Sequence, residues 1–167
     1  MKVIFLDFDD VLNSERTAIC WGWGPNRHAS RQLDENIENP RLDAVAVALI
    51  RKLCEKTNAK IVLTTSWRLR FSIQAFIDMF SKYYDWHDAS IIDITHQLRI
   101  QPSRGCEVID WLEDHNEITH YVIIDNLPLG FKKNFVHVEY DNGLSYQNYV
   151  DALNILQGEP SGNSIFV

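Results

Sequence analysis

The feature that most constrains the fold lies near the start of the chain, where the apolar run 3–6 is followed by Asp7, Asp9 and Asp10. A short apolar run with β-branched residues predicts a buried strand. Burying one unpaired carboxylate is costly and crowding three adds repulsion, so such a cluster indicates a bound cation or a functional protonation state. The alternative, a solvated loop, is less favoured because two similar polar strand ends follow downstream.

The composition is that of a globular protein, with 46% hydrophobic and 23% charged residues among 167. This length predicts one catalytic domain over 1–157 and a loose tail over 158–167. The net charge of −7 argues against an extended nucleic-acid-binding surface, although a local basic groove remains compatible with it. Three cysteines without metal-ligand spacing, no signal peptide and no membrane-length apolar stretch predict a cytoplasmic protein without a membrane partner.

Strand-like and helix-like segments alternate along the chain. Apolar runs predict strands over 3–8, 60–64, 90–94, 121–124 and 135–138. Helical spacing predicts helices over 41–57, 73–80, 104–115 and 145–156, the third of them capped by Ser103. The segment 13–40, with Gly22, Gly24, Pro25 and Pro40, is expected to be irregular. This alternation predicts a mostly parallel five-stranded sheet with helices on both faces.

Polar residues stand where three of these strands end. Asp7 and Asp9 end the first, 64–66 (Thr-Thr-Ser) end the second, and Asp125 with Asn126 ends the fourth. Arg104 lies near a predicted helix start. Ligands of open parallel sheets bind beyond the carboxyl ends of the strands, so we expect these side chains to converge on one crevice.

In these positions the chain resembles the haloacid dehalogenase (HAD) superfamily of phosphotransferases. The family's first motif, Asp-x-Asp-x-Thr/Val after an apolar strand, is matched by 7–11, and its second, a strand ending in Thr or Ser, by 61–64. Arg104 is the candidate for the third motif, a basic residue near a helix start, and 123–125 match the acidic fourth motif. More narrowly, 63–68, 104–112 and 141–144 are similar to a HAD branch linked to phosphatase domains of RNA-repair proteins.

The resemblance implies a three-layer α/β/α, Rossmann-like fold with a minimal cap and Mg²⁺-dependent hydrolysis of phosphomonoesters through an aspartyl-phosphate. It implies that Asp7 is the nucleophile and Asp9 the general acid and base. Thr64 would hydrogen-bond a phosphate oxygen, and Arg104 would balance the phosphoryl charge. Mg²⁺ would bind carboxylate oxygens of Asp7 and Asp125 and the backbone carbonyl of Asp9.

Two positions depart from the family pattern. Asp10 stands where the family commonly has Gly, and Asn126 stands at the second acid of the fourth motif. We expect Asp10 to shape the turn or lie outside the metal's direct ligands, and Asn126 to hold a metal-bound water or fix the loop. Thr65 is a further secondary candidate. Basic alternatives to Arg104 are Arg99, Lys132 and Lys133.

The segment 13–40 is too short for a large cap domain, so we expect a small flap and an open site. Open sites suit large phosphorylated substrates, such as a nucleotide or a nucleic-acid end. Aromatic and basic residues of this segment either stack on a base and meet phosphates or pack the loop against the body. They are Trp21, Trp23, Arg27, His28 and Arg31.

Two rival classes of function remain. A receiver-type phospho-accepting module also uses paired acids and a Thr, but its phosphorylated Asp lies on a middle strand before the Thr, whereas the acid pair here precedes Thr64. A non-catalytic phosphate-binding module with the HAD fold is the second alternative, supported by Asp10 and Asn126. Trp67 and Trp111 are predicted as core aromatics. The histidines show no ligand spacing and are expected to have no catalytic role: His28, His87, His96, His115, His120 and His137.

Overall fold

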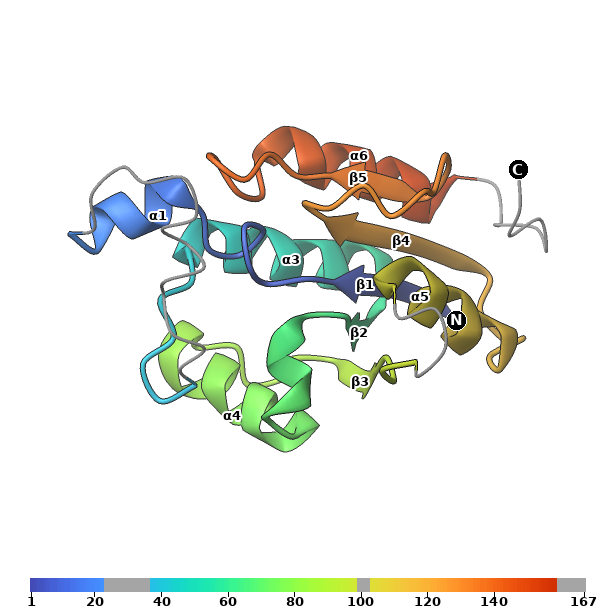
Figure 1. The fold of residues 1–167 in the computed structure, drawn as a ribbon, viewed down its shortest axis with the longest axis horizontal. Coiled ribbons are helices and arrows are strands. Elements are labelled where there is room, and N and C mark those ends of the chain that lie inside the picture. The colour runs from blue at the N-terminus through green and yellow to red at the C-terminus, as the bar shows by residue number, and fades with distance from the viewer. Residues whose placement is uncertain (23–36, 99–102, 159–167) are drawn as a thin grey trace.

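A computed structural model describes residues 1–22, 37–98 and 103–158. Its centre is one five-stranded sheet in the order β3-β2-β1-β4-β5, in which every neighbouring pair is parallel (Figure 1). The strands are β1 (Lys2–Leu6), β2 (Lys60–Leu63), β3 (Ile91–Ile94), β4 (His120–Asp125) and β5 (Phe135–His137). The five predicted strands are thus confirmed, and the sheet is parallel throughout rather than mostly parallel.

The order of the strands separates two of the fold classes that the sequence left open. With β1 in the middle, the sheet has the doubly wound Rossmann order. Receiver domains use the flavodoxin-like order 2-1-3-4-5, in which β1 and β3 are neighbours. Here β1 pairs with β2 and β4, so the receiver alternative is wrong.

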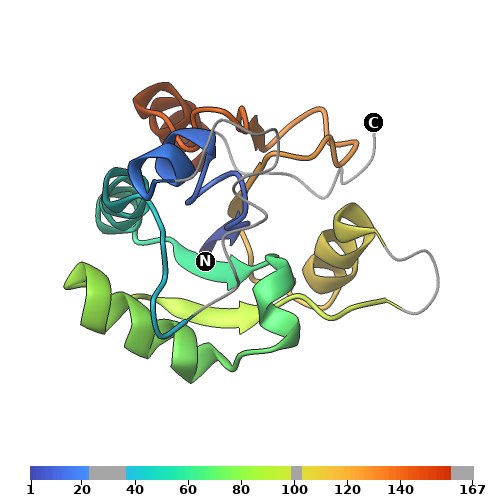
Figure 2. The same ribbon diagram turned by 60° about the vertical axis from the view of Figure 1, so that its left-hand side comes forward.

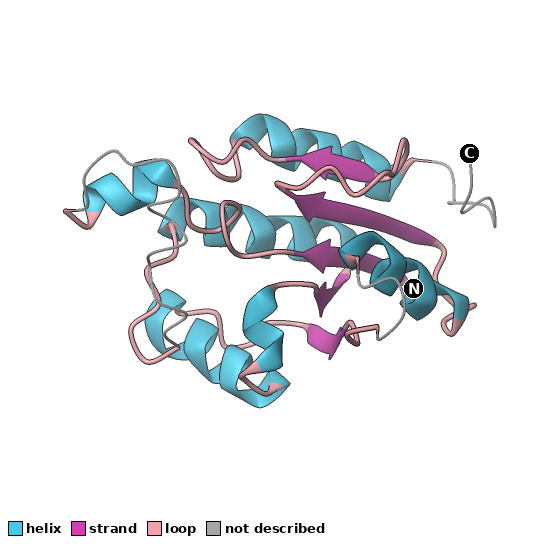
Figure 3. Ribbon diagram, in the orientation of Figure 1, coloured by secondary structure: helices cyan, strands magenta, loops and turns pink. Residues whose placement is uncertain are grey.

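Helices cover both faces of the sheet (Figures 2 and 3). The helical elements are α1 (Glu15–Cys20), α3 (Ala44–Thr57), the 3-10 helix η1 (Ser66–Leu69), α4 (Ile73–Tyr84), α5 (Arg104–Glu113) and α6 (Tyr146–Gln157). Buried residues of α3, α4 and α6 form one core with one face of the sheet, while α5 forms a second core with the other face. This is the predicted three-layer α/β/α architecture.

The period-two alternation of β1 decides which way its carboxylates point. Val3 and Phe5 belong to the core beneath α5, whereas Ile4, Leu6 and Phe8 belong to the core of α3, α4 and α6. Asp7 therefore lies on the α5 side of the sheet. Phe8 packs edge-on against Trp67, Phe76 and Phe80, with ring centroids 5.6, 5.6 and 5.9 Å away.

Side-chain caps explain where the helices begin. Ser103 caps α5 by accepting from the Cys106 N–H, as predicted. Asp43 caps α3, so this helix begins at Ala44 rather than at residue 41. Two helical segments were not predicted: α1, capped by Ser14 inside the stretch expected to be irregular, and η1, capped by Thr65. With six and four residues, both are too short to produce a periodic apolar pattern.

Some predictions fall outside the described residues. Half of the expected flap, with Trp23, Arg27, His28 and Arg31, belongs to this group, as do Arg99 and nearly all of the expected tail. The domain boundary at residue 157 stays a prediction. Among the helices that the structure describes, none combines the length and the apolar character needed to cross a membrane.

Phe8→Ala tests whether the packing beneath the acidic turn stabilises the fold. Phe8 is fully buried against three aromatic rings, so its truncation leaves a cavity and lowers the free energy of unfolding by about 3–5 kcal/mol. Urea denaturation followed by circular dichroism measures this loss. Tyr146→Ala, at a side chain that is 70% exposed, is the control and stays within about 0.5 kcal/mol of wild type. Equal effects of the two substitutions would contradict the packing argument.

Candidate active site

The carboxyl edge of the sheet places three of the predicted residues side by side. Leu6 is in register with Leu63 of β2 and with Ile124 of β4. The next residues in the three strands, Asp7, Thr64 and Asp125, therefore occupy neighbouring positions on the same face of the sheet. Figure 1 shows the arrows of β1 and β4 pointing to the side where α1 lies, so the turn 7–13 and α1 stand beyond this edge.

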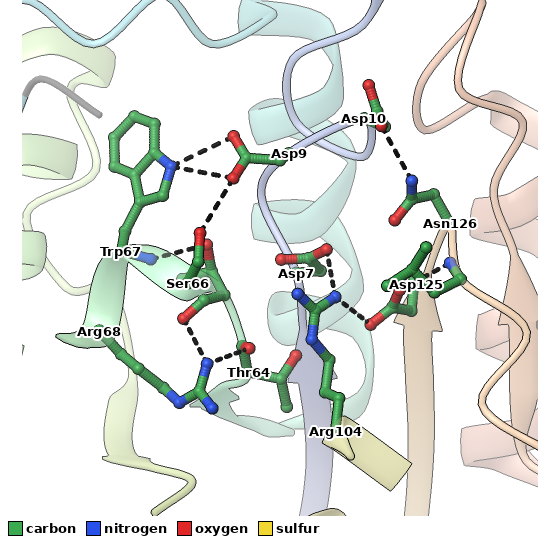
Figure 4. A network of polar contacts seen from close by, with 12 residues as sticks. Asp7, Asp9, Asp10, Thr64, Ser66, Trp67, Arg68, Arg104, Asp125 and Asn126 are labelled. Atoms are coloured by element: carbon green, nitrogen blue, oxygen red, sulfur yellow. Dashed lines mark hydrogen bonds and ion pairs between the residues drawn. The ribbon is translucent and has the colours of Figure 1, made fainter. Parts of the chain in front are cut away.

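Arg104 joins the two carboxylates of this row (Figure 4). Its Nη1 atom donates to Asp7 Oδ2 at 2.5 Å and to Asp125 Oδ2 at 2.7 Å. The side chains of Asp7 and Asp125 are buried, at 2% and 0% exposure, and that of Arg104 is 17% exposed. Three side chains that the sequence singled out from β1, β4 and α5 thus meet in one ion-pair cluster.

The start of α5 is positioned by its own local sequence. Ser103 ends the extended chain and caps the helix, which makes Arg104 the first helical residue. At Gly105 a Cβ atom would lie 2.7 Å from the backbone carbonyl oxygen of Leu129. Only glycine permits this close approach, so α5 can pack tightly against the loop after β4 and direct Arg104 at the row of acids.

Burial dominates the electrostatics of the cluster. Desolvation raises the pKa of Asp7 to about 7, because the opposing attraction of Arg104 does not outweigh burial together with the repulsion from Asp125 and Asp9. Desolvation likewise raises the pKa of Asp125 above its usual value, against the attraction of Arg104. Burial alone would lower the pKa of Arg104, but the two carboxylates outweigh it and keep the guanidinium charged. The single positive charge of Arg104 therefore does not compensate both carboxylates, those of Asp7 and Asp125.

Asp9 points away from Arg104, toward Trp67 (Figure 4). The indole Nε1–H of Trp67 lies 3.2 Å from both carboxylate oxygens of Asp9. Ser66 Oγ donates to Oδ2 and Asn13 Nδ2 to Oδ1, each at 3.2 Å. Trp67 is buried in the core as predicted, but the prediction missed its polar contact with Asp9.

Arg68 is a buried residue of the site that the sequence reasoning missed. Its Nη1 donates to the carbonyl oxygens of Thr64 and Thr65 at 2.6 and 2.7 Å, and its Nη2 pairs with Glu107 at 2.5 Å. Glu107 stands one helical turn after Arg104, so this pair ties the end of β2 to the helix that carries Arg104. That spacing, together with an Arg directly after the Thr-Thr-Ser-Trp run, was the available signal.

The two threonines at the end of β2 have different surroundings. Thr64 is fully buried, and its Oγ1 has no hydrogen-bond partner. Thr65 is equally buried, but its Oγ1 accepts from the Trp67 N–H as the cap of η1. Thr64 therefore has a hydroxyl available for a ligand, whereas that of Thr65 shapes the loop.

The two departures from the family pattern contact each other. Asp10 has a φ of +64°, in the left-handed region that favours glycine and that Asp tolerates better than most residues. Its Oδ2 accepts from the Asn126 side-chain amide at 2.9 Å, and its N–H donates to Asn13 Oδ1 at 2.8 Å. A carboxylate at position 126 would repel Asp10, so an amide suits this contact.

The remaining candidates lie apart from the cluster. Lys132 and Lys133 have exposed side chains in the loop after β4. Trp21 is 52% exposed and lies under the Arg41 guanidinium, 5.9 Å from its ring centroid. Trp111 packs in the core beneath α5 and donates to Asp93. His137 Nε2 lies 2.9 Å from the backbone oxygen of Asn126.

A divalent cation suits the donors at the centre of the site. Two buried carboxylates, those of Asp7 and Asp125, share the Nη1 atom of Arg104. Carboxylate and carbonyl oxygens are the ligands that Mg²⁺ prefers. In the described ranges, no group of three or more His, Cys, Asp or Glu side chains is arranged for a metal ion. The resemblance to the HAD superfamily implies that Asp7 and Asp125 would hold Mg²⁺ together with the backbone carbonyl of Asp9. In the structure, Arg104 Nη1 bridges one oxygen of each of these carboxylates, and Leu127 N–H donates to the other oxygen of Asp125.

Asp7→Asn tests the electrostatic cost of the buried carboxylate. The folded protein holds a proton on Asp7 that the unfolded chain releases above pH 4, so wild-type stability falls as the pH rises from about 4 to 7. Asparagine does not titrate, and we expect the variant to unfold about 2–6 °C above wild type at pH 8 and by a smaller margin at pH 5. Thermal unfolding in metal-free buffer measures both margins. Asp88→Asn, at an exposed carboxylate, is the control. If the difference in unfolding temperature between Asp7→Asn and wild type is the same at pH 5 and pH 8, the raised pKa of Asp7 is contradicted.

Trp67→Phe tests the contact with Asp9 while it keeps an aromatic ring in the core. Loss of the indole N–H removes a hydrogen bond to a charged group, so we expect the free energy of unfolding to fall by about 1–3 kcal/mol. Urea denaturation of wild type and variant measures the change. In an Asp9→Asn background the same substitution costs less, since the charged acceptor is absent. Equal costs in both backgrounds would mean that only packing was lost.

The comparisons with known proteins agree with this geometry. Residues 3–149 match the family described as the HAD domain in Swiss Army Knife RNA repair proteins. Neither the search of curated proteins nor that of solved structures found a match. The matched region contains the sheet except for Lys2, the first residue of β1, and it contains every residue of the cluster around Arg104. The chain therefore belongs to this family of HAD domains.

Proposed function

We propose that this HAD domain is a Mg²⁺-dependent phosphomonoester hydrolase that works through an aspartyl-phosphate on Asp7. The observation that carries the proposal is the meeting of Asp7 and Asp125 on Arg104, with Asp7 Oδ1 buried and unpartnered. Because the large majority of buried polar atoms in proteins are hydrogen-bonded, an unpartnered carboxylate oxygen at this position favours a role in binding or catalysis. An oxygen held ready beside a charged guanidinium is suited to attack an anionic phosphoryl group.

In the first proposed step, Asp7 Oδ1 forms a bond to phosphorus while the bond from phosphorus to the ester oxygen breaks. Asp9 gives a proton to that oxygen, and the alcohol leaves. In the second step, water attacks phosphorus, its proton passes to Asp9, and the bond to Asp7 breaks to release phosphate. Asp9 is hydrogen-bonded to Trp67 in the structure, so both proton transfers require its side chain to turn toward Asp7.

The neighbours of Asp7 have complementary tasks in this proposal. Thr64 Oγ1 donates to a phosphoryl oxygen, and Arg104 stabilises the negative charge on the group in transfer. Asp7 and Asp125 would hold Mg²⁺ with the backbone carbonyl of Asp9, and the bound ion supplies charge that keeps Asp7 ionised and attracts the phosphate. Thr65, Asp10 and Asn126 shape the turns that position these groups.

We further propose that the substrate is a phosphorylated nucleic-acid end or nucleotide. The family name refers to RNA repair proteins, and 13–40 is too short to form a large cap domain. The net charge of −7 fits recognition of a terminus better than of a long stretch of nucleic acid. The second candidate function is a phosphate-binding module without turnover, and the contact of Asp10 with Asn126 is the observation that favours it.

Hydrolysis of p-nitrophenyl phosphate with and without Mg²⁺ separates the two functions. We expect turnover by wild type only with Mg²⁺, and a loss of at least about 10³-fold in kcat for Asp7→Asn, because the nucleophile is gone. Asp88→Asn, the matched exposed substitution, keeps wild-type activity. Acid quenching with labelled substrate should trap phosphate on wild type and none on Asp7→Asn. Binding of phosphate without hydrolysis by wild type would favour the non-catalytic module.

A further inference from the structure

Three buried side-chain oxygens among the described residues have no hydrogen-bond partner: Asp7 Oδ1, Thr64 Oγ1 and Thr95 Oγ1. Two of them belong to the proposed phosphoryl site. The third, Thr95, is 1% exposed and has no role so far. Because nearly all buried hydroxyls in proteins are hydrogen-bonded, an orphaned one beside a reactive site indicates a ligand.

Thr95 extends the row formed by Asp125, Asp7 and Thr64 at the carboxyl ends of the strands, because it follows the next strand of the sheet, β3. It directly follows β3, and its N–H donates to Leu63 O at 3.0 Å, just as the Thr64 N–H donates to Leu6 O at 3.0 Å. Two residues earlier, Asp93 accepts from Trp111 of α5, so Asp93 lies on the α5 face. By the period of two, Thr95 lies on that face as well, with Thr64 and Asp7.

The spacing of the row excludes Thr95 from the phosphoryl group itself. Neighbouring strands lie about 4.8 Å apart, so Thr95 stands two strand spacings from Asp7. A phosphorus atom under attack must lie against Asp7, with its oxygens within reach of Thr64. Thr95 is beyond them, and its hydroxyl would therefore meet a different polar group of the same substrate.

The charges around Thr95 indicate which kind of group this is. Arg68 contacts the backbone of Thr95, because its Nε donates to Thr95 O at 2.8 Å. Its other donors serve the carbonyl of Thr64 and the carboxylate of Glu107, which neutralises it. Among the described residues, the cation that contacts Thr95 is thus already paired, and these surroundings suit a neutral group better than a second phosphate.

We propose that the Thr95 hydroxyl binds a sugar hydroxyl next to the phosphoester, so that the site selects ribonucleoside 3′-phosphates over their 2′-deoxy counterparts. This rests on the proposed function, since it takes the phosphate to lie against Asp7. The chemistry is a neutral hydrogen bond between two hydroxyls, and no bond is made or broken at Thr95. Thr95 is then a specificity residue, and the substrate supplies the hydrogen-bond partner that its hydroxyl lacks in the structure.

Thr95→Val removes the hydroxyl at nearly constant shape, and Thr95→Ser keeps it. The substrates are adenosine 3′-monophosphate, its 2′-deoxy analogue and p-nitrophenyl phosphate, which has no neighbouring hydroxyl. We expect wild type and Thr95→Ser to favour the ribonucleotide in kcat/KM by about tenfold or more. Thr95→Val should lose this preference, while its activity on the other two substrates stays within about twofold of wild type. Its unfolding temperature should equal or exceed that of wild type, because an unsatisfied buried hydroxyl is replaced by an apolar group.

An unchanged preference in Thr95→Val, or an equal loss on all three substrates, would overturn the assignment even if p-nitrophenyl phosphate is hydrolysed normally. If no substrate is turned over, the proposed function fails, and binding decides the role of Thr95. Isothermal titration calorimetry then measures the dissociation constants of the two nucleotides for Asp7→Asn and for the double variant Asp7→Asn/Thr95→Val. The ratio of the two dissociation constants takes the place of the ratio of kcat/KM values. A ribonucleotide preference that disappears with the hydroxyl supports the assignment, and equal affinities refute it.

Discussion

The ion pair of Arg104 with two buried carboxylates is the interaction on which the rest of the site depends. Asp7 and Asp125 come from neighbouring parallel strands, and burial makes their ionised forms costly. Arg104 offsets only part of this cost, and Asp7 Oδ1 remains unpaired. Much of the surrounding structure has the effect of bringing Arg104 to this row: the Ser103 cap, the close approach at Gly105, and the core of α5 against the sheet.

Two further polar contacts hold the neighbouring strand ends in place. Arg68 spans the carbonyl groups that follow β2 and β3 and pairs with Glu107 on the same helix as Arg104. Trp67 donates a hydrogen bond to Asp9 and also packs against Phe8 in the aromatic cluster. The same side chain therefore contributes both to the core and to the position of Asp9. A buried ion pair is weak evidence for stability, because the free energy lost on desolvating the two charges offsets most of their Coulombic attraction. These contacts are better understood as orienting devices whose burial limits the positions that the loop after β2 can take.

Much of this arrangement was predictable, because its signals are local. The five strands and four of the helices follow from apolar runs, helical spacing and caps, and the acids at positions 7, 9 and 125 stand at strand ends whatever the packing. Arg104 was identifiable as the residue after a capping serine. Trp67 and Arg68 were harder, since a tryptophan in a core and an arginine in a turn are common, and only their partners 58 and 39 residues away along the chain give them a polar role. Thr95 gave no signal, because one threonine after a weak strand is unremarkable until the register of the sheet is known.

The amino-acid sequence by itself determined the class of fold, the parallel sheet and the chemistry available at its carboxyl edge, because hydrophobic periodicity and residue type act over a few positions. Only the tertiary structure decided the strand order, which places β1 between β2 and β4 and makes Asp7 the neighbour of both Thr64 and Asp125. It also decided which donors each carboxylate meets: Arg104 for Asp7, Trp67 for Asp9 and Asn126 for Asp10. The physical reason is that hydrogen bonds and desolvation depend on distances between residues far apart in the chain, and those distances are set by packing and sheet register.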